Sequence, residues 1–245
     1  MQLTEEEIEA VLTEAKIKKQ AIQQQEAKTK WRNDMEAEAK RSWDAKEQWY
    51  RALDLAKRLN PEYRVDESVK EAFMLLCFYF TNDARFEESG EYSLKKGIML
   101  AGNVGTGKTI LMRIFSRNKR QCYEMIPCRK ASDEYSEDGS EMLHQYNNPI
   151  RSLLGTYEYF LQRELGVCFD DLGTETNPAR YYGKDLNTME MIILNRYDRR
   201  LPFNLTHFTT NLTWAEIEQR YGTRVISRLN EMVNVIELSG NDRRK

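Results

Sequence analysis

The chain has 245 residues and a mass of 29.0 kDa, which corresponds to one or two domains. Charged residues make up 31% and hydrophobic residues 40%, and 37 basic side chains nearly balance 39 acidic ones. The net charge of −2 excludes a strongly basic nucleic-acid-binding protein, so any contact with nucleic acid needs a local patch. Aromatic residues at 11% argue against a disordered chain.

The cysteine content and the hydropathy of the chain indicate its cellular location. The four cysteines form no C-x-x-C pair and there are only two histidines, so neither a disulfide scaffold nor a zinc site is expected. Reduced, buried thiols suit the cytoplasm, which is the location we expect. The longest apolar run, residues 73–80, is too short to span a membrane, and the first residues carry no secretory signal.

The first 60 residues contain no glycine or proline and alternate acidic with basic side chains. This composition predicts a long, charged, helical N-terminal arm, which we bound at residues 1–62 because Pro61 interrupts it. Three of the four tryptophans, Trp31, Trp43 and Trp49, lie in this arm. They need a surface to pack on, either the core of the same chain or that of a partner protein.

Residues 63–245 alternate short apolar strands with helices. Strands are predicted at 98–101, 121–127, 167–169, 206–210 and 233–238, and helices at 67–80, 108–118 and 186–197, with a further helix capped by Thr213 and Glu216. Strands alternating with helices predict an α/β fold with a central parallel sheet and helices on both faces.

A phosphate-binding loop follows the first of these strands. Its residues match G-x-x-x-x-G-K-[ST] and are Gly102, Asn103, Val104, Gly105, Thr106, Gly107, Lys108 and Thr109. Glycines let backbone N–H groups surround phosphates at the N-terminus of a helix. Lys108 is expected to reach the β- and γ-phosphates and the Thr109 hydroxyl to coordinate Mg²⁺, so the cofactors are ATP and Mg²⁺.

Paired acids end the strand at 167–169. In a parallel sheet this end faces the ligand crevice, so Asp170 is expected to hold Mg²⁺ and Asp171 to orient or deprotonate the attacking water. Glu175 lies near enough in sequence to share the role of base.

Together these motifs resemble the DnaC/DnaI helicase-loader branch of the AAA+ ATPases, which also includes the IstB transposition helper. The resemblance covers about residues 67–245. It is carried by the phosphate loop and by the runs at 170–175, 209–212 and 221–229, which occur in the order of the branch. It implies a RecA-like αβα core that binds ATP between neighbouring subunits, and hence a homo-oligomer that forms on ATP binding.

The resemblance also implies roles for single residues. Asn211 corresponds to the residue that senses the γ-phosphate, and Arg228 to an arginine finger that reaches the neighbour's ATP, with Arg224 one helical turn earlier in support. Arg180 and Tyr181 fall where loaders of this branch contact single-stranded DNA, and an arginine beside a tyrosine suits phosphate pairing and base stacking.

Two features depart from the wider AAA+ pattern. The chain has Asp170-Asp171 where most members have Asp-Glu, and a shorter second carboxylate does not favour rapid hydrolysis. It also ends soon after Arg228, so no C-terminal lid domain is expected, as in the helicase loaders.

Several functions remain open from the sequence. The first is an ATP-dependent loader that binds the replicative DNA helicase through its arm and single-stranded DNA through its assembled core. The second is an IstB-like transposition helper that binds duplex DNA. The third is a non-catalytic adaptor in which ATP is a switch. A small-molecule kinase lacks support, because no substrate lid or acceptor base is recognisable.

Overall fold

The computed structural model describes residues 5–148, 150–151, 156–240 and 242. The chain forms two compact units, Met1–Arg41 and Ser42–Lys245. The first unit contains one helix, α1 (Glu5–Lys40), stabilised by exposed ion pairs such as Lys18 with Glu14 and Lys40 with Glu36, each at 2.7 Å. Large apolar side chains along α1 are 46% to 61% exposed, namely Leu12, Ile17, Ile22 and Trp31. The predicted charged helical arm is confirmed over these residues.

The second unit begins with α2 (Ala45–Leu59), which is capped by the Asp44 side chain accepting a hydrogen bond from the Glu47 N–H. Small side chains on one face allow α2 to pack closely against α3 (Glu67–Phe80), and the Trp49 ring meets the Phe73 ring edge-on at 4.7 Å. The structural division therefore lies before α2, whereas the predicted arm extended to residue 62.

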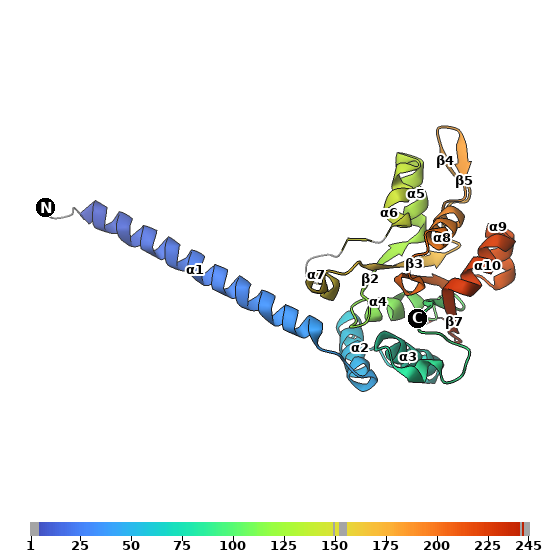
Figure 1. Cartoon of the computed structure of the whole chain (residues 1–245), viewed down its shortest axis with the longest axis horizontal. Helices are drawn as coiled ribbons and strands as arrows, with labels where there is room; N and C mark the ends of the chain where they lie inside the picture. The colour runs from blue at the N-terminus through green and yellow to red at the C-terminus, as the bar shows by residue number, and fades with distance from the viewer. Residues whose placement is uncertain (1–4, 149, 152–155, 241, 243–245) are drawn as a thin grey trace. The chain divides into compact units, whose positions relative to one another are not determined.

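Five parallel strands form the central sheet in the order β2–β3–β6–β1–β7. Figure 1 labels β2, β3 and β7 of this sheet. Their bounds are β1 (Gly97–Ala101), β2 (Tyr123–Pro127), β3 (Gly166–Leu172), β6 (Thr206–Thr210) and β7 (Val233–Glu237). The five predicted strands are confirmed, and β3 continues beyond the predicted end through the two acids. Because β6 lies between β1 and β3, the carboxyl ends of these three strands are neighbours.

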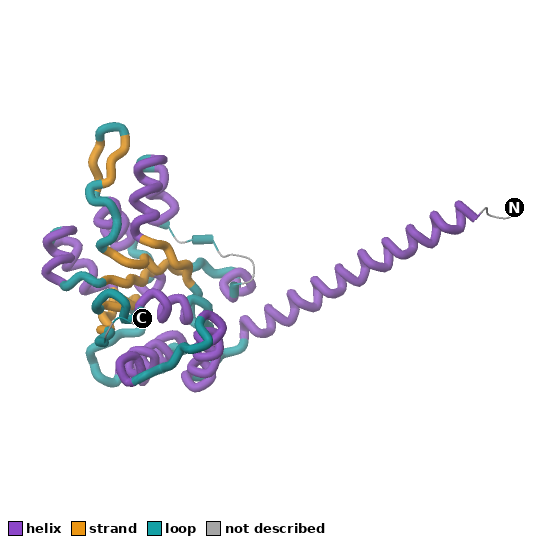
Figure 2. The backbone as a smooth tube through the Cα atoms, turned by 180° about the vertical axis from the view of Figure 1, so that it is seen from behind, coloured by secondary structure: helices purple, strands orange, loops and turns teal. Residues whose placement is uncertain are grey.

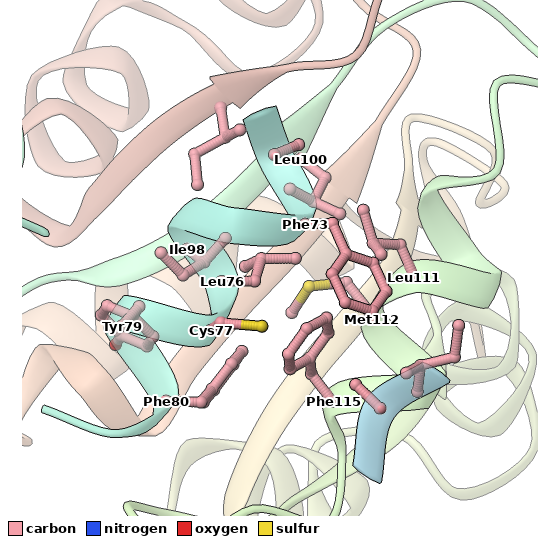
Figure 3. Close-up of a cluster of buried hydrophobic side chains, with 14 of the residues drawn as sticks. Phe73, Leu76, Cys77, Tyr79, Phe80, Ile98, Leu100, Leu111, Met112 and Phe115 are labelled. Atoms are coloured by element: carbon pink, nitrogen blue, oxygen red, sulfur yellow. The ribbon is translucent and has the colours of Figure 1, made fainter. Parts of the chain in front are cut away.

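Helices cover both faces of the sheet, so the predicted αβα core is confirmed (Figure 2). Side chains alternate along β1: Ile98 and Leu100 pack against α3 and α4 (Lys108–Phe115), and Met99 packs on the opposite face. Figure 3 shows the cluster on the α3 and α4 face, in which aromatic and aliphatic side chains of the two helices gather with Ile98 and Leu100.

The opposite face carries α5 (Cys128–Asp138), α8 (Thr188–Asp198), α9 (Trp214–Tyr221) and α10 (Thr223–Met232). The predicted capping box is present at α9, where Thr213 and Glu216 bond reciprocally. Shorter elements are η1 (Ala84–Glu87), α6 (Glu141–Asn147), α7 (Tyr157–Leu161) and η2 (Phe203–Leu205). All four cysteines are buried and free, as predicted.

A small antiparallel hairpin follows β3, formed by β4 (Ala179–Tyr181) and β5 (Lys184–Leu186). Its two-residue turn is Tyr182-Gly183, and both residues have positive φ, 44° and 79°. Such turns match the twist of paired strands but disfavour a residue as large as tyrosine. None of the helices in the described part of the chain combines the length and apolarity needed to cross a membrane.

Candidate nucleotide-binding site

The phosphate loop connects the end of β1 to the start of α4. Gly102, Gly105 and Gly107 have φ of 146°, 83° and 95°, a range in which residues with a Cβ are strained. Gly107 caps α4, so the helix N-terminus opens onto the loop. Lys108 is 5% exposed, and its Nζ donates to the carbonyl oxygens of Gly102 and Asn103 at 2.7 and 2.8 Å.

A cavity of about 560 Å³ lies over this loop. Residues 104–111 form its floor, and Asp171, Thr174 and Asn211 line it from the ends of β3 and β6. The wall that sequence reasoning missed is the connection from α2 to α3, which contributes Asn60, Glu62, Tyr63, Arg64 and Asp66, together with Val69 in the first turn of α3. The Pro61 break marked this segment as a turn but gave no sign of where it packs. The volume is in the range of small-molecule sites.

Asp170 lies at the point where the loop and the sheet meet. Its Oδ1 accepts hydrogen bonds from Thr109 Oγ1 at 3.0 Å and from Thr209 Oγ1 at 2.7 Å. Burial raises the pKa of the Asp170 carboxyl above its ordinary value, while the bonds from Thr209 and Thr109 oppose that rise. The structure thus brings Thr109 and Asp170 together, as the sequence predicted for a metal site.

The donor chemistry of this pair fits Mg²⁺. A carboxylate and a hydroxyl are hard oxygen ligands, and a divalent cation would offset the cost of burying the Asp170 charge. Among the described residues, no group of three or more histidine, cysteine, aspartate or glutamate side chains could hold a metal. Magnesium commonly binds one or two protein ligands together with substrate phosphates and water, and this sparse site suits that pattern.

Asp171 and Asn211 both line the cavity, as expected for residues near the γ-phosphate. Asp171 has φ of 57°, and the pairing of β3 with β6 shifts register between Phe169 and Leu172. Because of this irregularity, the two consecutive acids lie in different environments. Asp170 is 8% exposed, whereas Asp171 is half-buried and lines the cavity.

Glu175 lies outside the residues that line the cavity. Its side chain is buried, where Oε1 accepts from Arg220 Nε at 3.1 Å and from the Tyr221 hydroxyl, and Oε2 accepts from the Gly173 N–H at 3.0 Å. A carboxylate whose oxygens are engaged by three donors, away from the cavity, is badly placed to act on the attacking water. The structure therefore assigns Glu175 a role in holding α9 against the loop after β3.

The two arginines of α10 also lie away from the cavity lining of their own chain. The Arg228 guanidinium stacks on the Tyr197 ring, and its Nη1 lies 3.1 Å from the Tyr197 hydroxyl oxygen and 3.4 Å from Glu231 Oε1. Arg224 is largely exposed and lies 3.7 Å from Asp198. Neither arginine lines the cavity over the phosphate loop.

The predicted DNA-binding pair lies on the β4–β5 hairpin. Arg180 makes a two-pronged ion pair with Asp185, at 2.7 and 3.2 Å. The Tyr181 ring packs over Gly139 and against Tyr135. Tyr182, which the sequence analysis did not single out, is 92% exposed at the tip. The Tyr-Gly pair between two short polar runs is the signal that could have found it.

No protein-family model and no curated protein sequence matches the chain. Among solved structures, AMPPCP-bound DnaA from Aquifex aeolicus is similar with a TM-score of 0.45 and 16% identity, over 74% of this chain and 50% of that one. A crystal structure of a DNA replication initiation factor is similar with a TM-score of 0.48 and 12% identity, over 74% and 49%. The chain spans about half the length of both solved chains. The function of this chain therefore has to be argued from its own residues.

Proposed function

We propose that this chain is an ATPase that binds ATP and Mg²⁺ in the cavity over the phosphate loop. The observation that carries the proposal is the 3.0 Å hydrogen bond between Thr109 Oγ1 and Asp170 Oδ1. These two groups are 61 positions apart in sequence, yet they meet beside the loop with the chemistry that a nucleotide-bound Mg²⁺ requires.

Each residue then has a defined task. The loop amides and the α4 N-terminus bind the phosphates, and Lys108 exchanges the carbonyls of Gly102 and Asn103 for phosphate oxygens. Thr109 and Asp170 hold the metal, which when bound would neutralise charge developing on the phosphates. Asp171 orients the attacking water, and Asn211 contacts the γ-phosphate from the end of β6.

Nucleotide binding and phosphate release by the full chain test this assignment. Lys108→Ala should weaken binding of a fluorescent ATP analogue by at least about tenfold and abolish turnover, because the loop loses its only side-chain cation. Lys130→Ala, which removes an exposed lysine of α5, is the matched control and should bind like wild type. Equal binding by wild type and Lys108→Ala would contradict the proposal.

We further propose that the ATPase works as a helicase loader in the cytoplasm, with α1 contacting the replicative DNA helicase and the core assembling on ATP. Trp31 on α1 is 46% exposed, whereas Trp43 and Trp49 pack within the second unit. We place the partner contact on α1, where Leu12, Ile17 and Ile22 are also 56% to 61% exposed. Arg228 supports assembly, because a cation away from its own cavity can serve a neighbour's ATP.

Single-stranded DNA is the proposed second ligand. We propose that Tyr182 of the hairpin contacts it, in place of Tyr181. Tyr181 is packed and Arg180 is already paired, but the Tyr182 ring is available for base stacking. An IstB-like helper would prefer duplex DNA. An adaptor would assemble without turnover, which the short side chain of Asp171 favours.

Mass photometry with and without ATP–Mg²⁺ and oligo-dT, alongside phosphate release, separates these functions. Assembly on ATP and single strands, followed by turnover, supports the loader. Assembly on duplex DNA supports the transposition helper, and assembly without turnover supports the adaptor. A wild-type chain that binds ATP yet remains monomeric under all conditions would contradict the proposed assembly.

A further inference from the structure

Thr209 is a buried residue of β6 that contacts both acids of the site. Its side chain is fully buried and is not among those lining the cavity. Its hydroxyl donates to Asp170 Oδ1 at 2.7 Å and accepts a hydrogen bond from the Asp171 N–H at 2.8 Å. One side chain therefore bridges two consecutive acids of β3 from the neighbouring strand.

The bond to the Asp171 N–H stabilises an unusual backbone. Asp171 adopts a left-handed φ of 57° where the β3–β6 register shifts, so its N–H cannot join a regular ladder. This N–H is only partly accessible to water, and leaving it without an acceptor would destabilise the conformation. By accepting that bond, Thr209 supports the turn that places Asp171 at the cavity.

The bond to Asp170 differs in kind from the one made by Thr109. Thr109 lines the cavity, so its hydroxyl can leave Asp170 and coordinate a metal. Thr209 lies behind the carboxylate and can hold it in place before and after the metal binds. The three groups form a chain from N–H through hydroxyl to carboxylate, in which each bond polarises the next.

We propose that Thr209 is a positioning residue of the ATPase site, which orients the Asp170 carboxylate for Mg²⁺ and fixes Asp171 for the attacking water. The inference rests on the proposed ATPase function and gives a role to Thr209, which lies in the run at 209–212 but received no role from the sequence. Thr209 acts through the two acids and does not itself touch the nucleotide.

Thr209→Val and Thr209→Ser provide the contrast. Valine keeps the shape of threonine and removes both hydrogen bonds, whereas serine keeps the hydroxyl. Thr210→Val is the matched control on the same strand, because the Thr210 hydroxyl is also buried and also makes two bonds, to the Leu172 carbonyl and from the Leu212 N–H, but contacts neither acid.

The full chain is measured in three ways. The affinity for a fluorescent ATP analogue is measured in EDTA, the affinity of the nucleotide complex for Mn²⁺ is measured by electron paramagnetic resonance, and kcat is measured with Mg²⁺. In Thr209→Val, Mn²⁺ affinity and kcat should each fall about 10- to 100-fold, as for other residues behind a metal ligand. Metal-free nucleotide affinity should change by less than about twofold, because the phosphate loop is untouched.

Thr209→Ser should restore Mn²⁺ affinity and kcat to within about threefold of wild type, and Thr210→Val should lower the melting temperature while leaving both values near wild type. Wild-type values in Thr209→Val, or equal losses in Thr209→Val and Thr210→Val, would overturn the inference. So would a serine variant as impaired as the valine variant. If the valine variant does not fold, Thr209→Cys replaces it, with intermediate values expected because a thiol is a weak donor.

The proposed function and this inference fail differently. Absence of nucleotide binding by wild type both in EDTA and with Mg²⁺ would overturn both. Normal binding by wild type with unimpaired Mn²⁺ affinity in Thr209→Val would overturn the inference alone. If wild type binds nucleotide without turnover, the Mn²⁺ affinity of Thr209→Val still tests whether Thr209 positions the metal site.

Discussion

The guanidinium of Arg228 lies over the ring of Tyr197, with 4.1 Å between Cζ and the ring centroid. This stacking fixes the direction of an arginine that is only partly exposed and that also lies near Glu231. An arginine finger must be held ready before the neighbouring subunit arrives, since ordering a free side chain would oppose assembly. For the arginine finger that we propose, the Tyr197 ring on α8 would provide that restraint.

Mixing two inactive variants tests whether Arg228 acts on a neighbour. Arg228→Ala and Lys108→Ala should each lose turnover, by about 10³-fold if Arg228 contributes as in GTPase systems. In an equal mixture, a site from the Arg228→Ala chain can meet the intact Arg228 of a Lys108→Ala neighbour. Turnover should recover to about a quarter of wild type for head-to-tail contacts.

Arg228→Lys is the informative control, because it keeps a charge but loses the planar group that stacks on Tyr197. We expect it to remain impaired. Full activity of Arg228→Ala alone, or no recovery in the mixture although both chains co-assemble, would contradict a role in trans.

Trp49 and Trp31 should differ sharply in their effect on stability. The Trp49 ring meets Phe73 at 4.7 Å within the core, whereas Trp31 is 46% exposed on α1. Trp49→Ala should lower the free energy of unfolding of the second unit by about 2–3 kcal/mol. Trp31→Ala should leave it unchanged within about 0.5 kcal/mol. Urea unfolding followed by circular dichroism measures both, and equal effects would contradict the boundary before α2.

His207 should make the protein less stable in mild acid. It is fully buried, and its Nδ1 accepts from the Ile98 N–H at 3.0 Å. Burial, with smaller contributions from the charges of Arg120 and Arg196, lowers its pKa from 6.5 to about 3. As the pH falls, His207 is protonated in the unfolded chain before it is protonated in the folded protein. The contribution of neutral His207 to the free energy of unfolding is therefore complete above pH 6.5 and is lost as the pH falls towards 3, by up to about 1.4 kcal/mol per pH unit.

The free energy of unfolding between pH 6.5 and pH 5 checks this slope. His207→Asn removes the titrating group, so that variant should be less stable at pH 7.5 but should depend less on pH over this interval. The exposed His144, the only other histidine, gives the control variant His144→Asn, which should keep the wild-type slope. An unchanged slope in His207→Asn would refute the assignment.

Local sequence patterns predicted the parts of the site that are local in structure. The phosphate loop is a strand, a turn with left-handed glycines and a helix start, all within residues 97–109, so its geometry follows from neighbouring residues. The short apolar run at 98–101 likewise predicted a strand, and β1 is buried on both faces. The meeting of Asp170 and Thr109 could also be predicted, because the phosphate loop and the acids at the end of a parallel strand were both assigned to Mg²⁺.

Residues joined by strand register could not be found in this way. Thr209 meets Asp170 and Asp171 only because β6 pairs with β3 in one register, interrupted by an irregularity that no short pattern reveals. Glu175 shows the opposite case. It is close to Asp171 in sequence, but the chain turns away and pairs it with Arg220, 45 positions later.

Tyr182 provides the test of the hairpin as a DNA contact. Its ring is 92% exposed and stands edge-on to Tyr181, which packs on the core. Tyr182→Ala should weaken binding of the ATP-assembled protein to fluorescein-labelled oligo-dT by about tenfold, since stacking on one base contributes about 1–3 kcal/mol. Melting temperature and ATP binding should not change, because the side chain is so exposed. Tyr159→Ala, which removes another exposed tyrosine, on α7, is the control and should bind oligo-dT like wild type. If Tyr182→Ala binds normally while assembly is intact, the hairpin tip is not a stacking site, and single strands must be held by other surfaces of the assembled core.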